Sequence, residues 1–369
     1  MTKQVLDRIV ECSDEIGSFG PVSETLGSLA DPAATLLRQS GVARILQPQE
    51  YGGFETHPRD FAEAVIDIAR LDGCTGWIAG TVGLPPWELS TAPRRVRDEV
   101  WESDSDVWVA SAYQPAGALW PIDDGYYLAG QWEFVSGIDH CEWVLLGARR
   151  ADKPSRRVAH ALVPRADVRI VDDSWDVVGL NGTGSKDVVV TDAYVPAYRV
   201  LDHDDLEDGT AARRAGLGNP SYHLPFSTVF PLGITAAVIG MAEGALAHYH
   251  AYQLDRDDAV ENAAAEIRAS KYALLDTVSE FFHLVLDGHP IDRAARVRSR
   301  RDQTQAAWRA VRGLDEIVAQ SGLDGLRSDS PLQRFWRDAH TGLAHAVHTR
   351  RNMARCSGHI KAEHLGLAD

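Results

Sequence analysis

Apolar residues recur at intervals of three or four through the first part of the chain. This spacing places them on one face of an α-helix. Between two such stripes, the segment 48–58 (PQEYGGFETHP) is rich in Gly and Pro and predicts a turn. We therefore expect residues 1–105 to form an N-terminal helical domain. The stripes are Leu6, Ile9 and Val10, and then Phe61, Val65 and Ile68.

The pattern changes at about residue 106. Short runs rich in Val, Tyr and Trp follow, among them VWVASAY, GYYLAGQWEFVSG, CEWVLLGARR and KDVVVTDAYVP. Such runs favour β-strands, and the intervening DDG, SGID and NGTGS predict turns. Residues 106–212 are therefore predicted to form a central β domain, either a small barrel or a sandwich.

The last part of the chain returns to helical spacing. Residues 230–253 are long and apolar, with Ala and Gly at positions that permit close approach of another helix. Apolar stripes also run through 267–285 and 308–318, and a last helix is expected to begin near Pro331 and to run past His345. Four long helices in succession predict an antiparallel four-helix bundle over residues 213–369.

Charge and composition exclude several classes of protein. The 37 basic and 53 acidic residues give a net charge of -16, which argues against nucleic acid or an anionic membrane as the main partner. The four cysteines are scattered without a Cys-x-x-Cys pair, so reduced thiols are expected and a metal site is not. The first residues do not resemble a signal peptide, and we expect no apolar run that approaches the ~20 residues needed to span a bilayer. We therefore expect a cytoplasmic protein.

Three long motifs occur in the same order as in a known family. PQEYGGFE, GQWEFVSGIDHCEWVLLGA and WDVVGLNGTGSKDVVVTDAYVP resemble the N-terminal turn, the flavin-facing strand pair and the closing strand of acyl-CoA dehydrogenases. The resemblance covers nearly the whole chain. It implies an α+β, mostly α fold with an N-terminal helical domain, a central β-barrel or sandwich and a C-terminal four-helix bundle. No G-x-G-x-x-G follows a strand, and the order of elements excludes a Rossmann-type alternation.

Within this fold, the chain resembles flavin-dependent monooxygenases more than true dehydrogenases. The Tyr-x-Gly-Thr-like stretch near the dehydrogenases' glutamate base has no match in the tail RRNMARCSGHIKAEHLGLAD. By contrast, CTGWIAG (74–80), the Trp-x-Phe-x-Ser-Gly run (132–137) and RFWRDAHTGLAH (334–345) are similar to the monooxygenases. The chain is thus identified as a member of the two-component flavin-dependent monooxygenases, a group that contains aromatic hydroxylases and N-oxygenases.

That resemblance implies an oxygenase that receives reduced flavin, FADH2 or FMNH2, from a separate NAD(P)H:flavin reductase. With O2 as cosubstrate and no metal, it would hydroxylate a phenolic or polyketide-like molecule through a C4a-hydroperoxyflavin. Three alternatives stay open: an acyl-CoA dehydrogenase that oxidises an acyl thioester, an amine N-oxygenase, and a catalytically idle flavin-binding protein. The resemblance also implies a homotetramer arranged as a dimer of dimers. We expect the same from the apolar helix that begins at Phe230, because it is predicted to have more apolar surface than one bundle face needs.

The flavin-binding candidates lie on two predicted strands. In the family, the hydroxyl equivalent to Ser136 lies beside the flavin N5; otherwise Ser136 is an ordinary serine at the end of a strand. Phe134 shares its strand face by the two-residue period and would pack on the flavin ring or simply in the core. The resemblance also places Ala112, Tyr113 and Gln114 near the ring.

Histidine 345 is the candidate base. In relatives the histidine at this position of RFWRDAHTGLAH projects toward flavin and substrate, so His345 is expected to bind substrate and act in catalysis. An imidazole, with an ordinary pKa near 6.5, suits the removal of a phenolic proton. The same segment contains His340 and His348, and each of the three could equally be a surface histidine.

Other motif residues have both a chemical and a structural interpretation. In NGTGS, Thr183 and Ser185 stand on a tight turn that could bind phosphate or flavin, or merely form a hairpin. Trp87, in PPWE, is expected to help line an apolar substrate pocket. Arg337 and Asp338 are expected to make interhelical ion pairs, and His140 is expected to be a turn residue.

Overall fold

The computed structural model describes residues 2–153, 158–252 and 258–349. Its N-terminal part is helical, as predicted, because the apolar stripes pack inward. The helices are α1 (Thr2–Glu11), α2 (Ser13–Ser18), α3 (Gly20–Leu26), α4 (Asp31–Ser40), α5 (Pro58–Leu71), α6 (Gly73–Val82), α7 (Pro85–Ser90) and α8 (Arg94–Trp101). Along α5, Phe61, Val65 and Ile68 are fully buried, so the stripe read from the sequence is the face that packs in the core.

The central part forms one seven-stranded sheet among the described residues, with the order β5-β6-β2-β1-β3-β4-β7. Strands β1 and β3 pair in parallel, and the other neighbours are antiparallel. The strands are β1 (Val109–Ile122), β2 (Gly125–Val135), β3 (Trp143–Arg150), β4 (Val158–Pro164), β5 (Arg169–Val171), β6 (Lys186–Pro196) and β7 (Val200–Asp202). The register of β2 against β6 shifts between Trp132 and Val135. This irregularity lies directly before Ser136.

The C-terminal part is built around one enclosed helix. The helices here are α9 (His203–Glu207), α10 (Thr210–Ala215), α11 (Phe226–Val229), α12 (Leu232–Tyr252), α13 (Asp258–Leu286), α14 (Arg293–Gln320), α15 (Gly322–Gly325) and α16 (Pro331–Ala344). Helix α12 contacts α5, α6, α13, α14 and α16. A Cβ on Gly80 of α6 would lie 2.6 Å from the carbonyl oxygen of Gly233, so α6 and α12 approach at a pair of glycines.

The enclosure of α12 corrects two expectations from the sequence. The expectation that no apolar run is long enough to span a bilayer is wrong, because the segment Phe226–Ala251 has the length and composition to do so. However, 83% of its most apolar window is buried inside the protein. Its apolar surface is therefore used within the chain, because neighbouring helices cover it on several sides. The argument that this helix has surplus apolar surface for a tetramer interface is consequently wrong.

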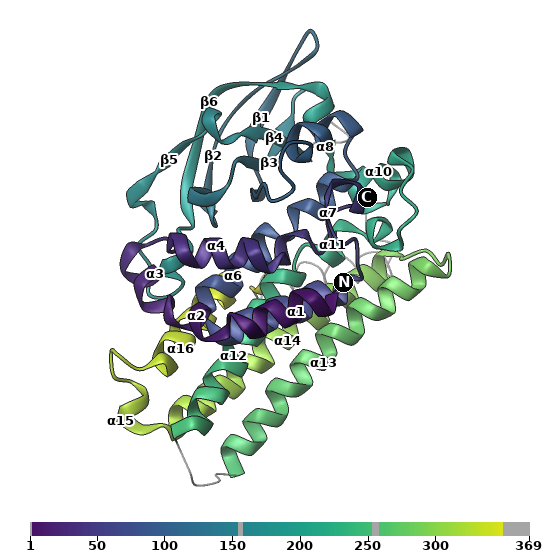
Figure 1. Ribbon diagram of the computed structural model, residues 1–369. Helices are drawn as coiled ribbons and strands as arrows, with labels where there is room; N and C mark the ends of the chain where they lie inside the picture. Colours follow the sequence, from purple (N-terminus) through teal and green to yellow (C-terminus); the bar gives the residue numbers. More distant parts are fainter. Residues whose placement is uncertain (1, 154–157, 253–257, 350–369) are drawn as a thin grey trace, which may run out of the picture.

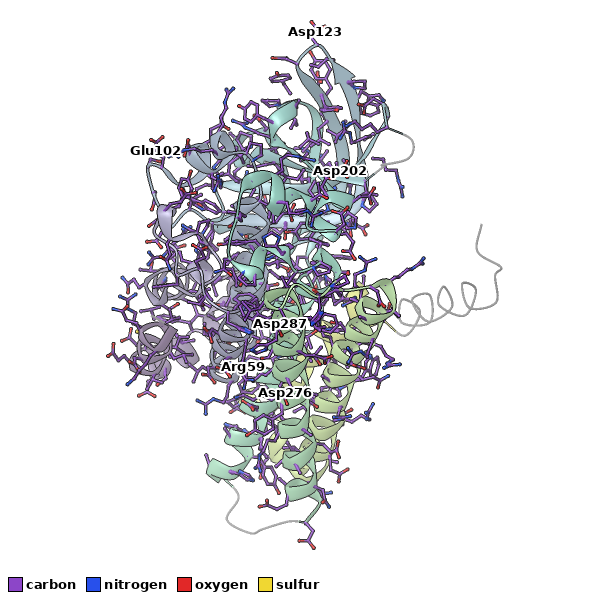
Figure 2. The ribbon with its side chains drawn as sticks, turned by 90° about the vertical axis from the view of Figure 1, so that its right-hand side faces the viewer. Arg59, Glu102, Asp123, Asp202, Asp276 and Asp287 are labelled. Atoms are coloured by element: carbon purple, nitrogen blue, oxygen red, sulfur yellow. The ribbon has the colours of Figure 1, made fainter. Side chains whose placement is uncertain are left out.

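The three parts pack against one another (Figure 1). The sheet lies at one end, α1–α4 and α6 cross the middle, and α12–α14 extend to the other end. Arg59 of α5 and Asp276 of α13 lie close together in Figure 2, with 3.5 Å between Arg59 Nη1 and Asp276 Oδ1. The region between the sheet and the bundle is where the candidate site lies.

Candidate active site

A small apolar pocket of about 190 Å³ lies where the sheet, α6 and α16 meet. Its walls are mainly aromatic and aliphatic side chains, with a few hydroxyls and one imidazole. The lining residues are Trp77, Phe134, Ser136, Trp175, Val177, Leu180, Ser185, Thr341, Ala344 and His345. The structure thus brings together four residues predicted from the sequence, namely Phe134, Ser136, Ser185 and His345.

Ser136 follows the last residue of β2 and is buried. Its Oγ accepts a hydrogen bond from Trp77 Nε1 at 3.0 Å. Phe134 reaches the same pocket for a different reason from the one predicted. Its φ of 65° and the register shift break the two-residue alternation, and its side chain is 56% exposed rather than packed in a core. The alternation argument is therefore wrong, although both side chains line one pocket.

The turn 180–185 adds two further hydroxyls behind Ser136. Ser136 Oγ lies 2.7 Å from Ser185 Oγ, which lies 2.7 Å from Thr183 Oγ1. Thr183 Oγ1 in turn donates to the carbonyl oxygen of Leu180 at 2.7 Å. Thr183 is buried behind the lining residues, so of the two turn residues predicted to bind cofactor only Ser185 reaches the pocket.

A buried carboxyl group holds this turn in place. Leu180 has a left-handed backbone (φ 59°), and its N–H donates to Asp338 Oδ1 at 2.6 Å. A Cβ on Gly179 would lie 2.3 Å from the carbonyl oxygen of Arg337, so the turn lies directly on α16. Burial raises the pKa of Asp338 to about 7. Asp338 therefore anchors backbone rather than joining an interhelical ion pair, which corrects that expectation; Arg337 does pair, with Glu24 at 2.6 Å.

His345 terminates α16 instead of lying within it. The helix ends at Ala344, and His345 has an extended ψ of 141°, so the expectation that the helix runs past His345 is wrong. Its Nδ1 accepts a hydrogen bond from the backbone N–H of Val347 at 3.3 Å, which leaves the proton of the neutral imidazole on Nε2. Burial, and secondly the Arg300 guanidinium, lower the pKa of His345 to about 4. The ring meets Trp77 edge-on, with 5.8 Å between centroids.

The other predicted contacts lie outside the pocket lining. Trp87 is fully buried and donates through Nε1 to the carbonyl oxygen of Ser221 at 2.7 Å. Ala112 and Gln114 lie on β1 and are not among the lining residues. Tyr113 packs in an aromatic cluster with Phe226 and Phe230, at centroid distances of 5.0 and 5.1 Å. The structure does not bring these four side chains to the pocket.

The segment that contains Trp87 also differs from the apolar pocket wall that was expected. Its Glu88 is fully buried, with Oε1 2.7 Å from His160 Nδ1. The second oxygen of Glu88 has no hydrogen-bond partner among the described residues. The Glu88 carboxylate therefore lies beside His160, whose ring packs against Tyr113, and Glu88 is not among the residues that line the pocket at Ser136.

The remaining histidines are engaged elsewhere. His140 lies in a short 3₁₀ turn, as expected, with Nε2 2.8 Å from the carbonyl oxygen of Leu29. His340 is partly exposed and lies 2.8 Å from Asp315. His348 is fully buried, with Nε2 3.0 Å from Thr235 Oγ1 and Nδ1 3.0 Å from the Gly342 carbonyl oxygen. Among the three histidines of this segment, His345 is the one that lines the pocket.

Six lining residues were not predicted as site residues, among them Trp77, Trp175 and Thr341. Trp77 lies in the CTGWIAG motif, and Trp175 is the first residue of the WDVVG motif. Both could therefore have been predicted from the motifs that carry the family resemblance. Thr341 lies in the last turn of α16, four residues before His345. Its Oγ1 is buried and has no hydrogen-bond partner within the described ranges. An unpaired buried hydroxyl in a pocket wall fits a site whose ligand supplies the partner.

Comparison with known proteins identifies the family to which the chain belongs. A family model for the acyl-CoA dehydrogenase C-terminal domain matches residues 232–350. A pigment production hydroxylase from Rhodococcus erythropolis is 46% identical, with 94% of this chain and 93% of that protein covered. The oxygenase subunit HsaA of a flavin-dependent monooxygenase from Mycobacterium tuberculosis is 36% identical over 94% of this chain and 92% of its own. The chain therefore belongs to the flavin-dependent monooxygenases built on the acyl-CoA dehydrogenase fold.

Several relatives within that class are oxygenase subunits or components. The crystal structure of HsaA from M. tuberculosis superposes with a TM-score of 0.91 and covers 100% of each chain, at 34% sequence identity. The oxygenase component of an FADH2-dependent resorcinol hydroxylase from Rhizobium is 29% identical over 91% of this chain and 88% of its own. The fold and the family expected from the sequence motifs are thus confirmed.

Proposed function

We propose that this protein is the oxygenase component of a two-component flavin monooxygenase that hydroxylates a phenolic small molecule. The observation that carries the proposal is one pocket whose lining includes Ser136, His345 and the indole rings of Trp77 and Trp175. Resorcinol, in the name of one relative, is a phenol, which supports an aromatic substrate. Carbon hydroxylation is favoured over amine oxidation because His345 offers a partner for a phenolic oxygen.

The lining residues fit a reduced flavin. Trp77, Trp175 and Phe134 contribute aromatic side chains to the lining, and Ser136 and Thr341 contribute side-chain hydroxyl groups, alongside the polar side chains of Ser185 and His345. When bound, the reduced flavin supplies the electrons that activate O2. The protein would hold the ring against Ser136, exclude bulk water with the aromatic walls and orient the substrate at His345. FADH2 is the form in the name of the resorcinol hydroxylase, and FMNH2 stays an equal candidate here.

The imidazole of His345 would meet the phenolic oxygen in its neutral form. With a pKa of about 4, His345 is uncharged at neutral pH, and Nε2 bears its proton while Val347 N–H occupies Nδ1. In this tautomer Nε2 donates a hydrogen bond that stabilises a phenolate oxygen. To act as the base, the imidazole must accept the phenolic proton, which requires the 3.3 Å bond from Val347 to give way.

The pocket is smaller than a complete flavin site. A volume of about 190 Å³ falls below the ~300–1,000 Å³ usual for ligand pockets. The lining residue Phe134 is 56% exposed, and Val178, next in sequence to the lining residue Val177, is 73% exposed. We propose that a neighbouring subunit of a homotetramer completes the site, that a separate NAD(P)H:flavin reductase supplies the flavin, and that the enzyme acts in the cytoplasm.

The pocket lining favours this function over an acyl-CoA dehydrogenase. A dehydrogenase needs a carboxylate base at the flavin, and the lining residues of the described chain include no Asp or Glu. The proposal is tested by adding chemically reduced FMN or FAD and a panel of phenols to the protein, without any reductase, and then admitting O2. We expect a hydroxylated product, with less than one hydrogen peroxide released per O2 consumed.

Each alternative gives a different result in that assay. A dehydrogenase would make no hydroxylated phenol and would instead bleach bound oxidised FAD on addition of an acyl thioester. An N-oxygenase would convert amines and leave phenols unchanged. A protein that binds neither redox state of flavin would contradict the proposed function altogether.

A further inference from the structure

A row of buried hydroxyls connects the pocket to a backbone carbonyl. Ser136, Ser185 and Thr183 are 8%, 2% and 1% exposed, and their oxygens follow one another at 2.7 Å, ending on the Leu180 carbonyl oxygen. Ser136 and Ser185 line the pocket, whereas Thr183 lies behind them. The row therefore has one end at the ligand and the other fixed on the backbone.

The number of protons fixes the direction of every bond in this row. Each hydroxyl has one proton to donate, and a carbonyl oxygen can only accept. Because Leu180 O only accepts, Thr183 must use its proton there. Ser185 must then donate to Thr183, and Ser136 must donate to Ser185. This is the one arrangement that places a proton in each of the three contacts.

Ser136 is thereby left without a proton for the pocket. Its proton is held by Ser185, and one of its two lone pairs receives the Trp77 N–H. The second lone pair is what Ser136 can offer a ligand. The N5 atom of a reduced flavin carries an N–H, whereas N5 of an oxidised flavin carries a lone pair.

We propose that Thr183 and Ser185 are positioning residues that make Ser136 a hydrogen-bond acceptor, so that the site selects reduced over oxidised flavin. The inference rests on the proposed function, which places the flavin ring at Ser136. Such selection suits an oxygenase that takes reduced flavin from solution. In the oxidised flavin formed in turnover, the lone pair on N5 would face the lone pair on Ser136 Oγ, and this repulsion would favour dissociation. One hydrogen bond of this kind is worth about a tenfold difference in affinity.

Substitution of the residue behind the pocket gives the sharpest test. In Thr183→Val, Ser185 loses its acceptor and can turn to donate to Ser136, which then donates into the pocket. We expect the dissociation constants of oxidised and reduced FAD, titrated anaerobically, to differ by about tenfold less than in the wild-type protein. The change should come mainly from tighter binding of oxidised FAD. FMN is titrated in parallel.

Matched variants separate this effect from a general structural one. Thr183→Ser keeps the hydroxyl and should keep the wild-type ratio. Ser270→Ala removes a fully buried serine of α13, whose Oγ donates to the Glu266 carbonyl oxygen, and should leave the ratio unchanged. In a Ser136→Ala background, Thr183→Val should no longer alter the ratio, because the group through which it acts is gone.

The outcomes distinguish failure of the proposed positioning role from failure of the proposed function. Should Thr183→Val fail to fold, Ser185→Ala frees the Ser136 proton directly and should produce the same loss of selectivity. A ratio that stays at the wild-type value in the folded variants overturns the positioning role while leaving flavin binding intact. A wild-type protein that binds neither form of either flavin overturns both the inference and the proposed function.

Discussion

The indole N–H of Trp77 donates to the hydroxyl of Ser136 at 3.0 Å, and thereby joins α6 to the end of β2 at the wall of the pocket. The same indole ring meets the His345 imidazole edge-on. One side chain thus fixes the positions of both candidate catalytic residues. Trp77 lies on α6, within the CTGWIAG motif, and was not among the site residues predicted from the sequence.

Loss of this bond should loosen Ser136 without removing it. Trp77→Phe keeps an aromatic ring against His345 but has no N–H, so the hydroxyl keeps only its bond to Ser185. We expect a loss of about 1 kcal/mol in the free energy of unfolding and a larger fraction of consumed O2 released as hydrogen peroxide. Urea denaturation and a peroxide assay measure the two effects. Unchanged peroxide release would mean that Trp77 contributes to stability alone.

Removal of the hydroxyl itself should have a greater effect on the reaction. Ser136→Ala is expected to keep the fold and to uncouple O2 consumption from hydroxylation. One polar contact close to developing charge is worth ~3 kcal/mol, or about a hundredfold in rate. The ratio of product to hydrogen peroxide is the measurement, with Ser270→Ala as the control for loss of a buried serine. Wild-type coupling in Ser136→Ala would remove Ser136 from the site.

The fold was predictable because several long-range features have local signatures. Gly and Pro mark the turn at 48–58, apolar stripes mark α5, and the motif around Ser136 marks the strand that ends at the pocket. Ser185 and His345 were reached through motifs in the same way. Their grouping in one pocket follows from the packing of the sheet on α6 and α16, which is a property of the chain as a whole.

Several of the errors come from tertiary contacts that have no local signature. The role of Asp338 depends on the backbone N–H of Leu180, which lies 158 residues away in the sequence. The surroundings of α12 likewise depend on helices from both ends of the chain. Phe134 departs from the alternation of side chains along the strand because its φ is 65°. A phenylalanine gives no reason to expect a positive φ, which is uncommon for residues other than glycine.

The buried carboxyl group of Asp338 should make stability depend on pH. Burial raises its pKa to about 7, above the ~3.9 of an unfolded chain, so its ionisation costs stability as pH rises from about 4 to 7. Asp338→Asn keeps an oxygen to accept from Leu180 N–H and stays neutral. We expect the variant to be more stable than the wild type at pH 8, by up to about 4 kcal/mol, and equal to it near pH 4. Urea denaturation at the two pH values measures this difference.

An additional variant checks whether the bond to Leu180 is what Asp338 provides. Asp338→Ala would leave the Leu180 N–H buried and unpaired, which costs about 1–3 kcal/mol. If Asp338→Asn were no more stable than Asp338→Ala at pH 8, the hydrogen bond from Leu180 would not be what holds the turn.

The buried histidines should have the opposite influence. Burial lowers the pKa of His348 to about 3 and that of His345 to about 4, below the ~6.5 of an unfolded chain. The unfolded state therefore takes up protons first, and the stability contributed by the two neutral imidazoles is complete above pH 6.5 and lost as pH falls toward 4. Each should account for on the order of 2 kcal/mol between pH 6.5 and 4.5. His348→Gln should lose its share of this pH dependence in urea denaturation; a slope equal to that of the wild type would contradict the assignment.

The role of His345 is the prediction that most directly concerns the chemistry. If His345 takes the phenolic proton, His345→Ala should still bind reduced flavin and still consume O2, while hydroxylation slows by ~10²–10⁴-fold. The deficit should shrink as pH rises toward the phenol's own pKa near 10, because the substrate then ionises without help. His340→Ala is the matched control, since His340 lies on the same segment but contacts Asp315 outside the pocket. Product formation is measured between pH 6 and 9 by single-turnover experiments with preformed reduced flavin.

His345→Gln separates the two possible functions of the imidazole, because an amide can donate a hydrogen bond to a phenolate but cannot take up its proton. A base predicts that Gln is as slow as Ala, whereas a donor predicts that Gln recovers most of the rate. Wild-type product formation by His345→Ala across this pH range would make His345 a residue that only terminates α16 and packs against Trp77.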